Sequence, residues 1–404
     1  MPLEHAHPSG PTIQVFAREV VAADKGADTL PWLIYLEGGP GGKAPRPVDT
    51  SGWLGAALER YRVLLLDQRG TGRSTPLTAA TRPDLPAAEL AAYIRCFRAD
   101  SIVADAEHLR VELLGEDGRW DTLGQSYGGF LTMAYLSAAP QGIRRAHITG
   151  GLPSLTVSAE DVYRRTFPRM AQRTAEFYER YPDDHGAVLR LAQHLEAADV
   201  RLPNGDRLTD RRFRLLGHLL GMNAGMERLH WLLEGAWQGR ELSEGFLLAV
   251  QEVTGFADGP IYPLQEFIYG APGSSTGWAA ARVLEGMPEF APDADPLLLF
   301  GEMMFPWMFE EIAALRPFQE AADLLASYDE WPALYDREQL ARNEVPVAAA
   351  VYHDDVYVDR ELSMQTAAGV ANLRVWLTNE HEHDGVHGGP EVFRRLTDMT
   401  AGRR

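Results

Sequence analysis

Between residues 30 and 150 the chain alternates short apolar runs with stretches of helical composition. Strand-like runs that alternate with helices build a largely parallel sheet, which is covered by helices on both faces. This pattern therefore predicts an α/β fold. The predicted strands in this part of the chain cover residues 12–21, 32–36, 61–66, 119–123 and 145–150.

The pattern changes after residue 155 and returns near the end of the chain. From about residue 155 to 335 strand-like runs disappear, and Trp, Met, Arg and Glu recur at helical spacing. A length of 404 residues suits a core with a cap. We expect a core in two parts, residues 1–154 and 336–404, interrupted by a mainly helical cap domain of residues 155–335. Two buried strands and a terminal helix are predicted in the last part, at residues 345–352, 373–378 and 390–399.

Composition limits the class of protein. The chain has 38 basic and 57 acidic residues and a net charge of −19, which argues against a nucleic acid partner and is compatible with a cationic substrate. No apolar run approaches the roughly 20 residues that span a bilayer. Residues 1–10 lack the basic and apolar regions of a signal peptide. We therefore expect a cytoplasmic protein without a membrane partner.

The cysteine and histidine content predicts neither a disulfide nor a metal site. Cys96 is the single cysteine, so an internal disulfide is excluded, and it is expected to be a small buried residue in a helix. No cluster of Cys and His has the spacing of a zinc site. We expect no metal and no cofactor.

A G-x-S-x-G motif occupies residues 124–128, between a predicted strand and a predicted helix. A nucleophilic serine in this context lies on a sharp, strained turn, where side chains two residues to either side would collide with neighbouring backbone. We therefore expect Ser126 to be a nucleophile. The backbone N–H of Tyr127, at the start of the helix, is expected to stabilise an oxyanion.

A glycine-rich loop, GGPGG at residues 38–42, follows the early strand at residues 32–36. Serine hydrolases with a G-x-S-x-G turn take a second oxyanion donor from this position. Glycine allows the backbone to approach a substrate closely, and Pro40 stiffens the loop. We expect the N–H of Gly39 to be the second donor.

A serine nucleophile needs an acid and a histidine base, which follow it in that order in such chains. Asp354 and Asp355 come directly after a late strand, and Asp355 is the favoured acid. Asp359 is expected to be a helix cap. The base belongs in the loop after the last strand, where spacing alone does not choose among three candidates, His381, His383 and His387.

Several motifs together resemble prolyl aminopeptidases, also called proline iminopeptidases, of the α/β-hydrolase superfamily. DQRGTGRS at residues 67–74 is the most specific of these motifs, and it accompanies GGPG at 38–41 and GQSYGG at 124–129. The resemblance extends from about residue 12 to the end and is thin between residues 155 and 255. Further segments are similar to the larger members of the family, at residues 301–307, 355–358 and 382–385.

The resemblance implies an α/β-hydrolase fold and a serine exopeptidase that releases N-terminal proline from peptides. It implies Ser126, Asp355 and His383 as the catalytic triad, and so favours His383 among the three histidines. The alternatives are another acyl hydrolase, such as an esterase or amidase with the same triad, and a non-catalytic binding protein on this fold.

An aminopeptidase must recognise a free ammonium group, which in this family is a task for acidic side chains of the cap. Glu266 and Glu302 lie among aromatic residues and match family-like contexts, so we expect them to bind the substrate; the alternative is an ordinary solvated helix face. Four aromatic residues are candidates for a proline-ring pocket or for plain cap core, namely Tyr262, Phe267, Phe305 and Trp307.

Many family members carry His directly before GGPG, whereas this chain carries Glu37. This departure puts fine substrate preference in doubt, but not the hydrolase chemistry. The charged segment at residues 67–69 is expected to be structural, with Arg69 held against nearby carboxylates and carbonyl groups.

Overall fold

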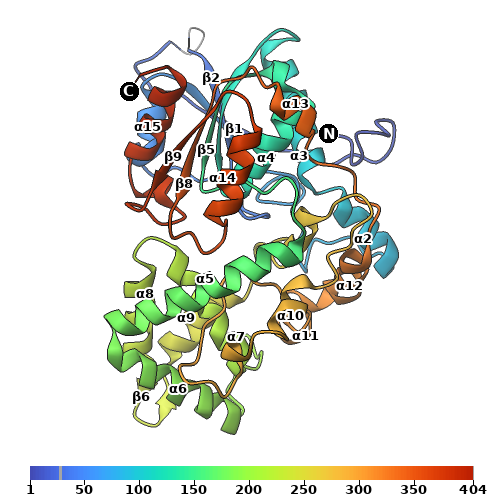
Figure 1. Ribbon diagram of the computed structural model, residues 1–404. Coiled ribbons are helices and arrows are strands. Elements are labelled where there is room, and N and C mark those ends of the chain that lie inside the picture. The colour runs from blue at the N-terminus through green and yellow to red at the C-terminus, as the bar shows by residue number, and fades with distance from the viewer. Residues whose placement is uncertain (27–29, 404) are drawn as a thin grey trace.

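The computed structural model describes residues 1–26 and 30–403, and a seven-stranded sheet lies at its centre (Figure 1). The strand order is β1-β3-β2-β4-β5-β8-β9. Strand β1 is antiparallel to β3, and all other pairs are parallel, as predicted. The strands are β1 (Ala17–Val20), β2 (Trp32–Leu36), β3 (Arg62–Leu66), β4 (Trp120–Gln125), β5 (Ile143–Thr149), β8 (Val347–Tyr352) and β9 (Leu373–Thr378).

Strands β2 and β8 are apolar and buried along their whole length, because helices cover both faces of the sheet. Leu33 and Tyr35 of β2 pack toward α1 (Gly52–Leu58) and α15 (Glu391–Thr400). Ile34 and Leu36, which point to the opposite face, join the core formed with the helices α2 to α4. Those helices are α2 (Ala87–Arg95), α3 (Ala99–Leu114) and α4 (Tyr127–Ala138).

Residues 87–114 are mostly helical by composition, and the structure divides them into the two helices α2 and α3. Between them, the buried Arg98 guanidinium donates to the carbonyl oxygens of Gly270 and Pro332. These bonds tie the junction to a distant part of the chain. Cys96, expected to be buried, is half-buried at the end of α2. The predicted strand at residues 12–21 is also shorter than expected, since only Ala17–Val20 pairs with β3.

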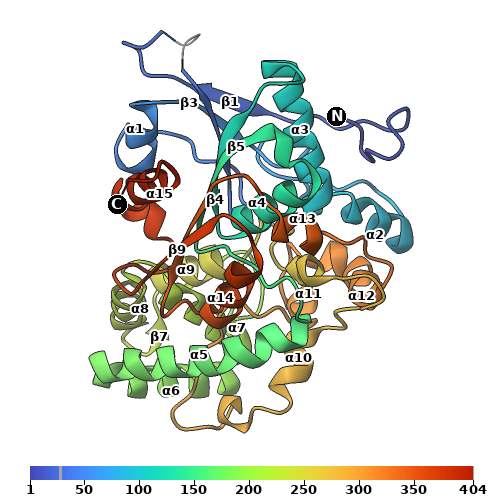
Figure 2. The ribbon, with the colours of Figure 1, turned by 45° about the horizontal axis from the view of Figure 1, so that its top comes forward.

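In the described structure, residues 155–335 carry eight α-helices and a short hairpin of β6 (Trp237–Gln238) and β7 (Glu241–Leu242). Both views place α5 to α9 together beyond one end of the sheet (Figures 1 and 2). No helix of the described ranges is long and apolar enough to cross a membrane. The helices are α5 (Ala159–Arg180), α6 (Pro182–Ala197), α7 (Asp210–Arg214), α8 (Gly225–Glu234), α9 (Glu244–Thr254), α10 (Ala279–Leu284), α11 (Met308–Glu311) and α12 (Gln319–Ser327).

These helices meet the sheet at the carboxyl ends of its parallel strands. Gly221, which follows α7, accepts a hydrogen bond from the backbone of His383 beyond β9. Ile261 lies against the loop after β2, where a Cβ added to Gly41 would be 3.1 Å from the Ile261 Cβ atom. The loops after β2 and β9 therefore contact the helical segment. Two further helices, α13 (Arg337–Ala341) and α14 (Arg360–Gly369), flank β8 in sequence.

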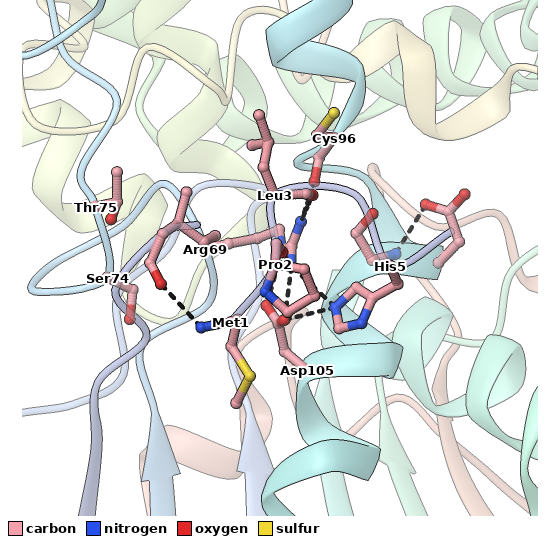
Figure 3. A network of polar contacts seen from close by, with 12 residues as sticks. Met1, Pro2, Leu3, His5, Arg69, Ser74, Thr75, Cys96 and Asp105 are labelled. Carbon is pink, nitrogen blue, oxygen red and sulfur yellow. Dashed lines mark hydrogen bonds and ion pairs between the residues drawn. The ribbon is translucent and has the colours of Figure 1, made fainter. Parts of the chain in front are cut away.

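The loop after β3 is held by buried ion pairs, in agreement with its predicted structural role. Arg69 is 1% exposed, and its guanidinium donates to both carboxylate oxygens of Asp105 at 2.6 and 2.7 Å. It also donates to the carbonyl oxygens of Pro2, Leu3 and Cys96 (Figure 3). Arg69 thus joins the N-terminal segment, the end of α2 and helix α3 to the loop.

Candidate active site

Ser126 lies at the sharp turn between β4 and α4, with φ 53° and ψ −121°. Its N–H donates to the Thr149 carbonyl of β5 at 2.9 Å, which fixes the turn to the sheet. A Cβ added to Gly124 would lie 2.2 Å from the Gly128 carbonyl oxygen, and one added to Gly128 would lie 1.9 Å from that of Leu36. Only glycine fits at these two positions, because the clashing atoms belong to the backbone.

Ser126 is the first member of a hydrogen-bonded chain of three side chains. Its Oγ atom lies 2.8 Å from His383 Nε2, and His383 Nδ1 lies 2.7 Å from Asp355 Oδ2. The other carboxylate oxygen of Asp355 accepts the backbone N–H groups of Tyr357 at 2.8 Å and Val358 at 3.0 Å. A hydroxyl, an imidazole and a carboxylate in this order can perform nucleophilic acyl transfer.

The surroundings of His383 favour its protonated form. Burial lowers the pKa of the imidazole, but the charge and hydrogen bond of Asp355, followed by the charge of Glu302, outweigh burial and raise the pKa above its ordinary value. His383 is 3% exposed and Asp355 is 4% exposed. A raised pKa makes the imidazole a stronger base toward the Ser126 hydroxyl.

The alternative acid and bases suggested by the sequence lie elsewhere. Asp354 pairs with His353 at 2.7 Å and is 41% exposed. His381 lies beside the rings of Tyr352 and Trp376. His387 is exposed and close enough to Glu37 to lower the pKa of that carboxyl.

The glycine-rich loop after β2 lies against Ser126, since a Cβ added to Gly38 would be 3.1 Å from the Ser126 Cβ atom. Gly39 has φ 117°, a conformation that favours glycine. Its N–H donates to no other group within the described residues. The N–H of Tyr127 also has no intrahelical acceptor, because Tyr127 is the first residue of α4. Both predicted oxyanion donors therefore lie beside the serine turn.

Glu302 lies in a group of polar and aromatic side chains next to His383. Its Oε1 atom accepts a hydrogen bond from the Tyr262 hydroxyl at 2.6 Å. The same hydroxyl lies 3.5 Å from His218 Nδ1. Burial, and then the nearby His383, lower the pKa of His218 to about 4, so its imidazole is neutral. The carboxylate of Glu302 is thus held beside the Ser126–His383–Asp355 chain.

Glu266 has a different environment. Its two carboxylate oxygens accept the backbone N–H groups of Ala279 at 3.1 Å and Ala280 at 3.0 Å, in the first turn of α10. The side chain is 4% exposed, and burial raises its pKa to about 7 although these N–H groups lower it. The alternative of a solvated helix face does not apply to Glu266, because the side chain is buried and contacts the start of a helix; substrate binding by Glu266 stays a prediction.

An apolar cavity of about 230 Å³ adjoins Tyr262 and His218. Of the four aromatic residues that were candidates for a ring pocket or for plain cap core, Tyr262 lines this cavity. Phe267 and Phe305 are buried in ring contacts of the helical segment, and Trp307 lies under the Arg211 guanidinium. The cavity is completed by Leu215, Val253, Phe256, Gly301, Met303, Met304 and Met308.

Comparisons with known proteins identify the family. Residues 31–239 match the family described as alpha/beta hydrolase fold. Proline iminopeptidase of Aeromonas sobria is 45% identical over 400 residues, which cover 98% of this chain and 94% of that protein. Proline iminopeptidase aneH of Aspergillus aculeatus is 35% identical over 401 residues, which cover 96% and 88% of the two chains. This chain belongs to the proline iminopeptidase family of α/β hydrolases.

Among solved structures, this chain is similar to a meta-cleavage product hydrolase of Pseudomonas fluorescens. The two have a TM-score of 0.47 and 13% sequence identity, and the match covers 96% of this chain and 94% of that chain.

Glu37, which stands where many proline iminopeptidases carry His, makes hydrogen bonds within and beside the glycine-rich loop. The Glu37 carboxylate accepts the N–H of Gly38 at 2.8 Å and the Tyr35 hydroxyl at 3.3 Å, while its carbonyl accepts the Gln68 side chain at 2.8 Å. Burial raises the pKa of Glu37, and the Gly38 N–H and His387 lower it. The carboxylate is turned toward the backbone of the glycine-rich loop.

Sequence reasoning missed several residues of this site. His218 comes from the region where the family resemblance is thin, and Phe256 follows directly after that region in a segment that carries no motif. Met303 and Met304 belong to the segment at residues 301–307 that resembles the family, and Met308 follows it, but the motif does not indicate that these side chains line a cavity. Only the three-dimensional arrangement brings these side chains to one cavity.

Proposed function

We propose that this chain is a serine aminopeptidase that releases proline from the N-terminus of peptides. The observation that carries the proposal is the carboxylate of Glu302 beside a hydrogen-bonded Ser126–His383–Asp355 chain. The identity with two proline iminopeptidases along nearly the whole chain supports the same reaction. Small peptides with a free N-terminal proline are the proposed substrates.

The proposed reaction is acyl transfer through a covalent intermediate. His383 takes the proton of Ser126 as the serine oxygen attacks the prolyl carbonyl carbon, and Asp355 holds the imidazole in the tautomer that leaves Nε2 free to accept. The N–H groups of Gly39 and Tyr127 stabilise the oxyanion. His383 then donates its proton to the leaving amine, and the peptide bond breaks. Water, activated by His383, hydrolyses the acyl-enzyme and releases proline.

Recognition of the substrate's secondary amine is assigned to Glu302. An ion pair at about 4 Å and an effective dielectric of about 20 contributes roughly 4 kcal/mol before desolvation. The apolar cavity beside Tyr262 suits a proline ring next to this charge. Glu266 is proposed as a second carboxylate that binds the substrate in the same region. Its carboxylate accepts two backbone N–H groups at the start of α10.

The helical residues 155–335 are proposed to act as a cap that bears Glu302 and the ring cavity, between core parts 1–154 and 336–404. A cap over the site would restrict it to substrates that enter from a free end. A cytoplasmic location remains a prediction from the sequence.

The experiment that tests the function compares a prolyl arylamide with a free amine and its N-acylated counterpart. We expect the wild type to cleave the free form at least tenfold faster in kcat/KM, and Ser126→Ala to cleave neither. Equal cleavage of both forms would favour an esterase or amidase with the same three residues. Absence of any cleavage by the wild type would favour a non-catalytic binding protein.

A further inference from the structure

A groove of about 770 Å³ lies on the outer side of the glycine-rich loop. This volume falls within the range of ligand-binding clefts, about 300–1,000 Å³. Three residues, Val253, Phe256 and Tyr262, line both this groove and the inner apolar cavity. The groove and the inner cavity are therefore neighbours that share a wall. The groove is further lined by residues 39–42, Leu248, Glu252 and Asp258.

Phe256 in the shared wall has a strained backbone, with φ 50°. A bulky residue in this left-handed region costs about 1–3 kcal/mol, and such residues gather at ligand sites. The Phe256 ring is stacked on that of Tyr262, with centroids 5.9 Å apart and planes 17° apart. This wall therefore leads from the outer groove to the hydroxyl that contacts Glu302.

The walls of the groove combine apolar surface with negative charge. Leu248 of α9 is 56% exposed and supplies apolar contact area. Glu252 and Asp258 are exposed on the rim. Lys43, which follows the glycine-rich loop, lies 4.0 Å from Asp258 and offsets part of that charge. The two carboxylates exceed the single cation, so the rim is complementary to a basic ligand.

We propose that this groove binds the part of a peptide substrate that follows its N-terminal proline, and that it favours a basic side chain there; this inference rests on the function proposed above. The groove begins at Gly39, whose N–H is assigned to the scissile carbonyl. A proline ring held in the inner cavity leaves the rest of the peptide to cross the loop at residues 39–42. The outer groove is the hollow that continues from this loop.

The test compares two peptide amides, Pro-Lys-Gly-NH₂ and Pro-Glu-Gly-NH₂, by the rate of proline release. The quantity measured is the ratio of their kcat/KM values, in which changes common to both peptides cancel. We expect the wild type to favour the lysine peptide by about threefold to tenfold at low salt, because exposed ion pairs change affinity by small factors. The ratio should shrink at 0.5 M salt, where the screening length falls to about 4 Å.

Three variants assign this preference to the groove. The double variant Glu252→Gln/Asp258→Asn should bring the ratio close to one, whereas Lys43→Gln should increase it. The matched control is Glu285→Gln/Glu289→Gln, which removes two exposed carboxylates outside the groove lining and should keep the wild-type ratio.

Each other result overturns the inference. A wild-type ratio of one, or a preference that survives in the double variant, excludes the groove as the site of the leaving peptide. An equal change in the control variant shows an effect of overall charge. Failure of the proposed function is distinct, because the wild type would then release no proline from either peptide or from the prolyl arylamide.

Discussion

The substitution Asp355→Asn should reduce kcat by about 10⁴-fold, equivalent to about 5.4 kcal/mol of transition-state stabilisation. The geometry around the carboxylate explains why. Its Oδ1 atom accepts two backbone N–H groups, from Tyr357 and Val358. An asparagine must keep its oxygen on that side, so its NH₂ group faces His383 Nδ1. The imidazole then carries its proton on Nε2 and cannot accept the proton of Ser126.

The assay is the pH dependence of prolyl arylamide hydrolysis, with KM and kcat determined separately. We expect kcat to fall while KM changes little, since Asp355 does not contact the substrate. His383 must be neutral to act as a base, and its raised pKa places the acidic limb of kcat/KM above the ordinary histidine value. Asp355→Asn removes the negative charge that helps to raise this pKa, so the limb should move to lower pH.

The matched control is Asp354→Asn at the neighbouring position. Asp354 is 41% exposed and pairs with His353, so activity should stay within about twofold of wild type. Thermal unfolding of both variants checks that the fold is intact. A loss of less than tenfold in Asp355→Asn, or an equal loss in Asp354→Asn, would refute the assignment of the acid.

Three further substitutions separate binding from stability. Glu302→Gln should lower kcat/KM for the free-amine arylamide by about 30-fold and should leave kcat/KM for the N-acylated substrate unchanged. This factor corresponds to about 2 kcal/mol, half of the ion-pair energy of roughly 4 kcal/mol given above. Glu266 has a pKa of about 7 against an ordinary 4.5, so its contribution to stability is complete below pH 4.5 and is lost as the pH rises through 7. Glu266→Gln should abolish this pH-dependent loss, about 3 kcal/mol at most, in denaturant unfolding at pH 5 and 8; an unchanged pH dependence would contradict the assigned burial. Arg69→Met removes the guanidinium partner of the buried Asp105 carboxylate, which keeps only its contact with His5, and should lower the free energy of unfolding by about 3–5 kcal/mol; a loss below 1 kcal/mol would contradict a structural role for the pair.

The sheet could be predicted from the sequence because parallel strands buried on both faces form continuous apolar runs. The run at residues 32–36 agrees with β2 to the residue. The contacts at the break between α2 and α3 could not be predicted, since Arg98 donates there to carbonyl groups more than 170 positions away. The amino-acid composition of a segment predicts that it forms a helix, but it does not predict contacts with residues that are distant in the sequence.

In the candidate site too, residues indicated by a local motif could be predicted, whereas contacts between residues distant in the sequence could not. Ser126 is marked by a turn whose glycines are required by neighbouring backbone. Three histidines within seven positions share the same local context, and the hydrogen bond that distinguishes His383 spans 257 positions. Substrate binding by Glu266 stays a prediction from its sequence context, whereas its contacts in the fold could not be predicted. Its partners at the start of α10 lie 13 and 14 positions away, beyond the reach of a motif.

The order of the reactive groups along the chain has a consequence for its biosynthesis. The nucleophile leaves the ribosome early, whereas the imidazole that activates it follows 257 positions later. At about 5–20 residues per second, this distance corresponds to roughly 10–50 s of translation. Throughout that interval the growing polypeptide carries a serine without a base and is chemically inert toward peptides. Late completion of the site thus acts as a built-in delay, and the newly made chain gains activity only when its final strand and loop have joined the sheet.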